Sequence, residues 1–152
     1  MSKLIIAVIG DSEASENKKG IAREVGRLVA EKGWILVTGG LSGVMEAASQ
    51  GASEAGGTVV GILPQGSKES ANRYVAIPIA TNMGHARNVI IAHTADALIA
   101  VGGGSGTLSE IAMAGKLGKP VFAINSWDVA PAVAVNGPQA AIEACERYLG
   151  GS

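Results

Sequence analysis

The chain has 152 residues and a formal net charge of −1, from 12 basic and 13 acidic residues. This balance leaves no basic footprint for a nucleic acid, so neither DNA nor RNA is an expected partner. Hydrophobic residues make up 47% of the chain and aromatic residues only 3%, so we expect one domain over residues 1–152 with a core of Val, Ile, Leu and Ala.

The first part of the chain alternates apolar runs with helix-periodic segments. Residues 4–9 are a continuous apolar run that ends at Gly10, which is typical of a strand buried on both faces. Ile21, Val25 and Leu28 recur at helical spacing before Gly33, a typical stop residue. In chain order the sequence predicts a strand at 4–9, a helix at 17–32, a strand at 34–38, a helix at 43–55 and a strand at 58–63.

The second part continues this alternation after a polar loop at residues 65–74. Pro78 lies inside the next short strand and predicts an edge position or an early end for it. Asn82 is a possible helix cap, and Pro138 suits the first turn of the last helix. The expected elements are a strand at 75–79, a helix at 82–94, a strand at 95–101, a helix at 106–117, a strand at 120–124, an irregular segment at 125–136 and a helix at 138–149.

This order of elements predicts a three-layer α/β Rossmann-like fold, in which helices cover both faces of a central parallel sheet. The single cysteine, Cys145, rules out an internal disulfide and favours a reducing compartment. The amino-terminal apolar run lacks a signal-peptide cleavage site, and no apolar stretch reaches membrane-spanning length. We therefore expect a cytoplasmic protein with no membrane partner.

Glycine-rich turns follow three of the predicted strands. Because ligands of open α/β sheets bind beyond the carboxyl ends of the strands, these turns would meet at one site. Missing side chains let a ligand approach the backbone, and N–H groups at a helix start attract an anion such as phosphate. The predicted ligand-binding residues in these turns are Gly10, Asp11 and Ser12; Gly39, Gly40, Ser42 and Gly43; and Gly102, Gly103, Gly104, Ser105, Gly106 and Thr107.

The turn at residues 102–107 is the most informative of the three, because it joins a strong strand to a helix. It is not a Walker A loop, since no Gly-Lys-Ser/Thr follows it. It also differs from the dinucleotide fingerprint, because Thr107 stands where the third glycine belongs, so NAD is not an expected cofactor. The structural alternative is that these glycines only make a tight strand-to-helix turn.

Two charged residues are candidates for the same site. Glu110 completes a capping-box pattern with Thr107, which favours a structural role as a helix cap. Arg87 falls early in a predicted helix, where the helix dipole disfavours a cation and a bound anion would offset that cost. A surface ion pair of Arg87 with Asp96 or Glu110 is the alternative explanation.

Other residues carry weaker signals. His85 and His93 are eight positions apart and have no acidic or cysteine cluster beside them, so we predict no metal site built by the protein. Asp11 and Ser12 could cap the following segment or contact ligand hydroxyls. We expect Met45 and Met83 to be packing residues rather than groups that recognise a ligand.

Three stretches resemble the signature of the Lonely guy superfamily: Met-Gly-His-Ala-Arg-Asn at 83–88, Ala-Asp-Ala-Leu-Ile-Ala-Val at 95–101, and Gly-Gly-Gly-Ser-Gly-Thr-Leu-Ser-Glu at 102–110. Its members include phosphoribohydrolases of cytokinin-riboside monophosphates, long mislabelled as lysine decarboxylases. The resemblance implies that turn 102–107 holds a phosphate and that Met83 and Asn88 contact the ligand. Arg87 and Glu110 would be catalytic if the chain is a hydrolase.

Within this superfamily the chain is most similar to the short molybdenum cofactor carrier proteins and their bacterial relatives. The stretch Gly-Trp-Ile-Leu-Val-Thr-Gly-Gly at 33–40 and the pair Val101-Gly102 carry that likeness. The hydrolases usually have Pro where Gly102 stands and Lys where Asn88 stands. The resemblance implies a binding protein for the molybdenum cofactor, whose own dithiolene holds the metal.

Three functions therefore stay open. The first is a molybdenum cofactor carrier or storage protein. The second is a phosphoribohydrolase that cleaves the N-glycosidic bond of nucleoside 5′-monophosphates without pyridoxal phosphate. The third is a nucleotide sensor without catalysis. The resemblance also implies a homodimer or homotetramer. The helix faces around Ile90 and Ile111 could form its interface, but they could equally belong to the core.

Overall fold

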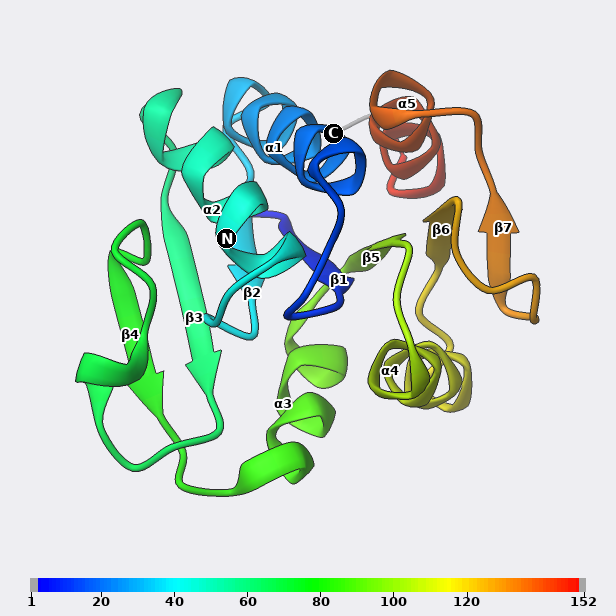
Figure 1. Cartoon of the computed structure of the whole chain (residues 1–152). Helices are drawn as coiled ribbons and strands as arrows, with labels where there is room; N and C mark the ends of the chain where they lie inside the picture. Colours follow the sequence, from blue (N-terminus) through cyan, green and yellow to red (C-terminus); the bar gives the residue numbers. More distant parts are fainter. Residues whose placement is uncertain (1–2, 151–152) are drawn as a thin grey trace.

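The computed structural model describes residues 3–150, and Figure 1 shows one sheet with helices on both faces. The sheet has the strand order β4-β3-β2-β1-β5-β6-β7, and every neighbouring pair is parallel. The predicted three-layer α/β Rossmann-like fold is therefore confirmed. The strands are β1 (Ile5–Gly10), β2 (Ile35–Thr38), β3 (Val59–Leu63), β4 (Ile77–Ala80), β5 (Ala97–Val101), β6 (Val121–Ile124) and β7 (Ala132–Ala134).

The helices form the two outer layers. Helices α1, α2 and α5 cover one face of the sheet, and α3 and α4 cover the other (Figure 1). Two short 3-10 turns, η1 (Lys68–Ser70) and η2 (Gly84–Ala86), lie in the connections on either side of β4. The α-helices are α1 (Glu16–Glu31), α2 (Val44–Glu54), α3 (Arg87–Thr94), α4 (Ser105–Lys116) and α5 (Pro138–Tyr148).

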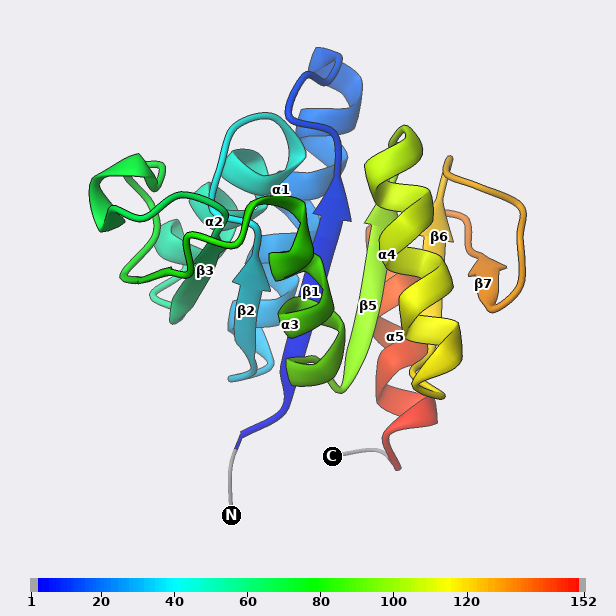
Figure 2. The ribbon, with the colours of Figure 1, turned by 90° about the horizontal axis from the view of Figure 1, so that it is seen from below.

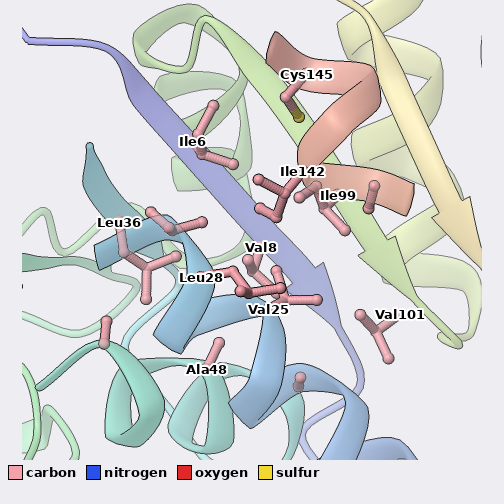
Figure 3. Packing of buried hydrophobic residues seen from close by; sticks show 14 of the residues in the cluster. Ile6, Val8, Val25, Leu28, Leu36, Ala48, Ile99, Val101, Ile142 and Cys145 are labelled. Carbon is pink, nitrogen blue, oxygen red and sulfur yellow. The ribbon is translucent and has the colours of Figure 1, made fainter. Parts of the chain in front are cut away.

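The continuous apolar run in β1 fits this layering, because consecutive side chains face opposite helical layers. Ile6 and Val8 are fully buried against α1, α2 and α5, while Ala7 and Ile9 pack toward α3 and α4. Figure 3 shows the hydrophobic cluster around Ile6 and Val8, which includes the buried Cys145. Burial raises the pKa of the Cys145 thiol to about 12, so it stays protonated at neutral pH.

Several expectations about individual elements are confirmed. Pro78 lies in β4, an edge strand, and Pro138 is at the start of α5. Gly33 follows α1 with a φ of +76°, a left-handed conformation that ends the helix. Ile111, considered above as an interface residue, is fully buried in the core, and Ile90 packs partly buried against the same cluster.

Two expectations about the second half were wrong. Asn82 does not cap a helix, because its φ of 54° is left-handed and α3 begins only at Arg87, after η2. Gly84, also at positive φ (58°), further delays the helix. The segment expected to be irregular contains the short edge strand β7, which pairs with β6. Within residues 3–150, no helix combines the length and the apolar character needed to cross a membrane.

Helices α1 and α2 cross with their backbones in contact. A Cβ on Gly26 of α1 would lie 2.0 Å from the carbonyl oxygen of Ala48, and a Cβ on Gly51 of α2 would lie 1.9 Å from that of Arg23. Real Cβ atoms do not approach an oxygen so closely, so the crossing requires glycine at both positions. Because α1 follows β1 and α2 follows β2 after short connections, the amino-terminal ends of both helices lie near the carboxyl ends of these strands.

Gly26→Ala is expected to lower the free energy of unfolding by about 2 kcal/mol, because the added methyl group forces the two helices apart. Gly20→Ala is the matched control, since nothing lies within 4 Å of a Cβ at this position of the same helix. There alanine should stabilise the helix by about 0.5–1 kcal/mol. Urea unfolding measures both variants, and equal stabilities would contradict the close crossing.

Candidate functional site

A cavity of about 170 Å³ lies at the carboxyl ends of β1, β2 and β5. The chain adds β2, β3 and β4 in turn on one side of β1, and then returns to add β5, β6 and β7 on its other side. The order of the strands therefore reverses between β1 and β5. Such a switch point is where open α/β sheets bind ligands. Figure 2 shows the ends of β1 and β5 together, with α4 beginning at the same end of the sheet. The cavity is lined by Val8, Ile9, Gly10, Asp11, Ser12, Gly39, Leu41, Met45, His85, Arg87, Asn88, Gly106, Thr107 and Glu110.

This lining brings together residues from all three glycine-rich turns and both charged candidates. The sequence-predicted residues that line the cavity are Gly10, Asp11, Ser12, Gly39, Arg87, Asn88, Gly106, Thr107 and Glu110. Eight others do not line it: Gly40, Ser42, Gly43, Met83, Gly102, Gly103, Gly104 and Ser105. The lining also includes Leu41, Met45 and His85, which sequence reasoning did not assign to a ligand. Of these, His85 lies in the 83–88 stretch that resembles the family signature.

Most of the residues outside the lining support the turns. Ser42 Oγ donates a hydrogen bond to the carbonyl oxygen of Ser12 (2.8 Å), and Gly40 N–H donates to Thr38 Oγ1 (3.0 Å). Gly43 packs against the backbone of Ser12, where a Cβ would lie 2.6 Å from its carbonyl carbon. Met83 is 49% exposed, so the packing role suggested by composition is wrong for it.

The glycine-rich turn before α4 is braced from outside. Ser126 Oγ donates to the carbonyl oxygen of Gly102 (2.5 Å), and Trp127 Nε1 donates to that of Gly104 (3.0 Å). Gly103 has a φ of +109°, and a Cβ there would lie 2.3 Å from Thr107 Oγ1. Both the backbone conformation and the space therefore require glycine at position 103.

The start of α4 presents free backbone N–H groups to this site. Gly104 is the N-cap, and the first intrahelical hydrogen bond runs from Leu108 N to the carbonyl oxygen of Gly104 (3.0 Å). The N–H groups of Ser105, Gly106 and Thr107 therefore have no acceptor within the helix. Together with the helix dipole, they favour an anion at this position.

The capping role expected for Glu110 is wrong. The helix starts at Ser105, so Thr107 is already inside it and cannot act as the cap. Glu110 instead points its carboxyl group into the cavity, where it is 8% exposed. Burial raises the pKa of Glu110 to about 7, and the nearby Arg87 guanidinium offsets part of this rise.

Arg87 is the first residue of α3 and is 7% exposed, so the surface ion pair considered above is also wrong. Its Nη1 donates to Asn88 Oδ1, and its Nη2 donates to the carbonyl oxygen of Gly39 at 3.5 Å. Its Nε is the one buried side-chain nitrogen or oxygen within residues 3–150 that has no hydrogen-bond partner. Burial lowers the pKa of Arg87, and the charge of Glu110 offsets part of this effect.

Gly39 makes room for this guanidinium. A Cβ at position 39 would lie 2.7 Å from Arg87 Nη2 and 2.7 Å from Met45 Sδ. None of the ion pairs recorded within residues 3–150 includes Arg87 or Glu110, although the two share the cavity. Over the same residues, no group of three or more His, Cys, Asp or Glu side chains is placed to hold a metal ion.

The solved structures that resemble this fold include proteins of known ligand. The molybdenum cofactor binding protein from Rippkaea orientalis superposes with a TM-score of 0.93 at 38% sequence identity, over 98% of this chain and 99% of that one. The molybdenum cofactor carrier protein from Chlamydomonas reinhardtii superposes with a TM-score of 0.87, also at 38% identity, over 97% and 99% of the two chains.

Comparison of sequences gives the family. An uncharacterized protein of Archaeoglobus fulgidus is 50% identical in an alignment of 151 positions that covers 95% of this chain and 96% of that protein. The cytokinin riboside 5′-monophosphate phosphoribohydrolase of Mycobacterium tuberculosis is 35% identical in an alignment of 116 positions that covers 70% of this chain and 62% of the hydrolase. These matches confirm the resemblance to the Lonely guy superfamily. Residues 3–146 match the sequence model of the SLOG cluster4 family, and the chain belongs to this family.

Proposed function

We propose that this protein binds a phosphorylated small molecule in the cavity between β1 and β5, and that this ligand is the molybdenum cofactor, which the protein carries or stores. One observation supports the proposal above the others. The buried Arg87, whose Nε has no partner in the described part of the chain, lines the same cavity as Gly106 and Thr107 with their free N–H groups. Cationic and N–H donors that converge without acceptors favour an anionic ligand.

The molybdenum cofactor fits these donors chemically. It is a pterin with a phosphate group, and its dithiolene holds the metal, so the protein needs no metal ligand of its own. The N–H groups of Ser105, Gly106 and Thr107 would receive the phosphate, and Arg87 would add a positive charge. The turns at residues 10–12 and 39–43 would contact the pterin. Two proteins of similar structure, described above, bind or carry this cofactor.

A phosphoribohydrolase is the second candidate, and the Arg87–Glu110 arrangement favours it. A carboxyl group with a pKa of about 7 exchanges a proton readily at neutral pH, which suits general acid–base catalysis. Glu110 would activate water or stabilise the charge that grows on the ribose, and Arg87 would position the nucleotide. The other carboxyl group in the cavity lining, that of Asp11, accepts a hydrogen bond from Gly104 N–H, so Glu110 is the buried carboxyl group available for this role.

One pair of measurements separates the candidates. The purified protein is mixed anaerobically with molybdenum cofactor released from a molybdoenzyme, and molybdenum and pterin are measured in the protein fraction after gel filtration. In parallel, the protein is incubated with AMP and other nucleoside monophosphates, and free base is measured by chromatography. We expect the carrier to retain both molybdenum and pterin, near one equivalent, and to release no base.

Other outcomes would contradict the proposal that the protein is a cofactor carrier. Base release without cofactor retention would establish the hydrolase and make Arg87 and Glu110 its catalytic groups. Nucleotide binding without base release or cofactor retention would establish a nucleotide sensor. The gel filtration also reports the molecular mass, which checks the expected homodimer or homotetramer.

A further inference from the structure

A carboxylate already occupies one N–H group of the turn that is proposed to receive the phosphate. Asp11 Oδ1 accepts a hydrogen bond from Gly104 N–H at 2.8 Å, across 93 positions of sequence. Asp11 also lines the cavity. A negative charge here interacts favourably with the positive end of α4. Asp11 therefore uses the same electrostatic feature that a bound phosphate would use.

The backbone around Asp11 is fixed in this position by the second glycine-rich turn. Val44 N–H donates to the carbonyl oxygen of Asp11 at 3.0 Å. At Gly43, which has a φ of +68°, a Cβ would lie 2.2 Å from the same oxygen. Asp11 does not cap α1, because Ser15 does so through a hydrogen bond from Lys18 N–H. The carboxylate is thus held at the start of α4 rather than at the start of its own helix.

A cation lies against the first residue of the same turn. The side chain of Lys18 passes over Gly102, where a Cβ would lie 2.7 Å from Lys18 Cδ and 2.9 Å from its Nζ. Gly102 has a φ of +58°, so glycine both fits the backbone and leaves room for the lysine. The ion pairs within residues 3–150 involve Lys19, Arg23, Arg27 and Lys32, and none involves Lys18.

Lys18 and Arg87 share an unfavourable placement. Lys18 lies in the first turn of α1 and Arg87 in the first turn of α3, and in both places the helix dipole disfavours a positive charge. Lys18 lies against the turn that leads into α4, and Arg87 lines the cavity that this turn borders. An anion bound at the start of α4 would offset both costs. This observation points to a ligand independently of the free N–H groups.

We infer that Asp11 and Lys18 tune the affinity of the 102–107 turn for a phosphate group in opposite directions. Lys18 attracts the phosphate, while the Asp11 carboxylate competes with it for the positive end of α4. The balance holds a phosphate monoester reversibly, as a protein that must release its ligand requires. The identity of the complete ligand rests on the proposed function, whereas the tuning of phosphate affinity rests on the turn itself.

The test measures the affinity of wild type, Asp11→Asn and Lys18→Gln for AMP and for inorganic phosphate by isothermal titration calorimetry. Asparagine keeps an oxygen that accepts from Gly104 N–H but removes the charge. Asp11→Asn should bind both probes about tenfold more tightly, and Lys18→Gln about tenfold more weakly, because each charged side chain lies against the turn that would hold the phosphate, in partly exposed surroundings.

Matched controls remove a charge of the same sign at a neighbouring position of the sequence. Glu13→Gln changes an exposed carboxylate of the same loop, and Lys19→Gln changes the neighbouring lysine, which faces Glu16 at 3.8 Å. Both should change the affinities less than about twofold, because exposed charges farther away are screened. Asp11→Ala completes the set, since it removes the hydrogen bond as well as the charge.

The outcomes distinguish this inference from the proposed function. If Asp11→Asn leaves the affinity unchanged and Asp11→Ala lowers it, Asp11 only supports the turn through its hydrogen bond, and the inference is overturned. Unchanged affinity in Lys18→Gln would overturn it too. Absence of any phosphate or AMP binding by wild type at millimolar concentrations would also overturn it. If both shifts are found but the molybdenum cofactor is not retained, the inference stands and the proposed function fails.

Discussion

Methionine in place of Arg87 is expected to weaken the binding of a phosphorylated ligand by about 100-fold or more while making the empty protein more stable. A buried charge–charge hydrogen bond contributes on the order of 3 kcal/mol or more to binding, which corresponds to this loss. Arg87 is a buried cation of the cavity, and its Nε has no acceptor among residues 3–150. The ligand would supply that acceptor.

The gain in stability has a separate cause. Burial lowers the pKa of Arg87, which means that the surroundings disfavour its charged form. Methionine has a similar length and carries no charge, so its burial removes this penalty. We expect the free energy of unfolding to rise by about 1–2 kcal/mol. The loss of attraction to Glu110 opposes the gain, and Arg87→Met combined with Glu110→Gln removes that opposing contribution.

Urea unfolding of the ligand-free protein and phosphate titration measure the two effects. Arg147→Met is the control, because it makes the same chemical change at an exposed position of α5. It should alter stability by less than about 0.5 kcal/mol and leave binding unchanged. If Arg87→Met is less stable than the wild type, Arg87 stabilises the fold by holding Gly39 and Asn88 in place. That result would contradict the idea that its buried charge serves ligand binding at the expense of stability.

The sheet and the place of the site could be predicted because local patterns determine them. Uninterrupted apolar runs that end in glycine mark strands buried on both faces, and parallel strands end at one edge. Gly10, Gly39 and Gly106 therefore line one cavity although they are far apart in sequence. The same reasoning placed Pro78 on an edge strand and Pro138 at a helix start.

The chemistry of the site could not be predicted as well, because it depends on long-range contacts. A capping pattern at Thr107 and Glu110 suggested a later start for α4, whereas its N-cap is Gly104. The hydrogen bond from Gly104 N–H to Asp11 crosses 93 positions of sequence. The position of Lys18 over Gly102 depends in the same way on how α1 packs beside β5. Spacing rules describe neighbours within one element and are silent on such pairs.

Glu110→Gln is expected to remove a pH dependence of stability that the wild type shows between about pH 4.5 and 7. The pKa of Glu110 rises from 4.5 to about 7 in the folded protein, chiefly because the carboxyl group is buried. Below pH 4.5 this group is protonated in both states. Between the two values the folded protein keeps a proton that the unfolded chain releases, so folding stability falls as the pH rises.

The loss is about 1.4 kcal/mol for each pH unit in this window, or about 3 kcal/mol in total above pH 7. Urea unfolding at pH 5, 6, 7 and 8 gives the difference between wild type and Glu110→Gln, which should grow in favour of the variant as the pH rises. Glu143→Gln, at an exposed position of α5, should give a flat difference.

A flat difference for Glu110→Gln as well would mean that Glu110 is ionised throughout this range and that Arg87 neutralises it. The Arg87 guanidinium would then be less available to a ligand, which weakens the case for an anion site. The predicted slope has the opposite meaning. With a pKa of about 7, Glu110 is neutral in about half of the molecules at pH 7 and in most of them below it, which leaves the positive charge of Arg87 uncompensated in the cavity. A phosphate is the group that this charge would attract.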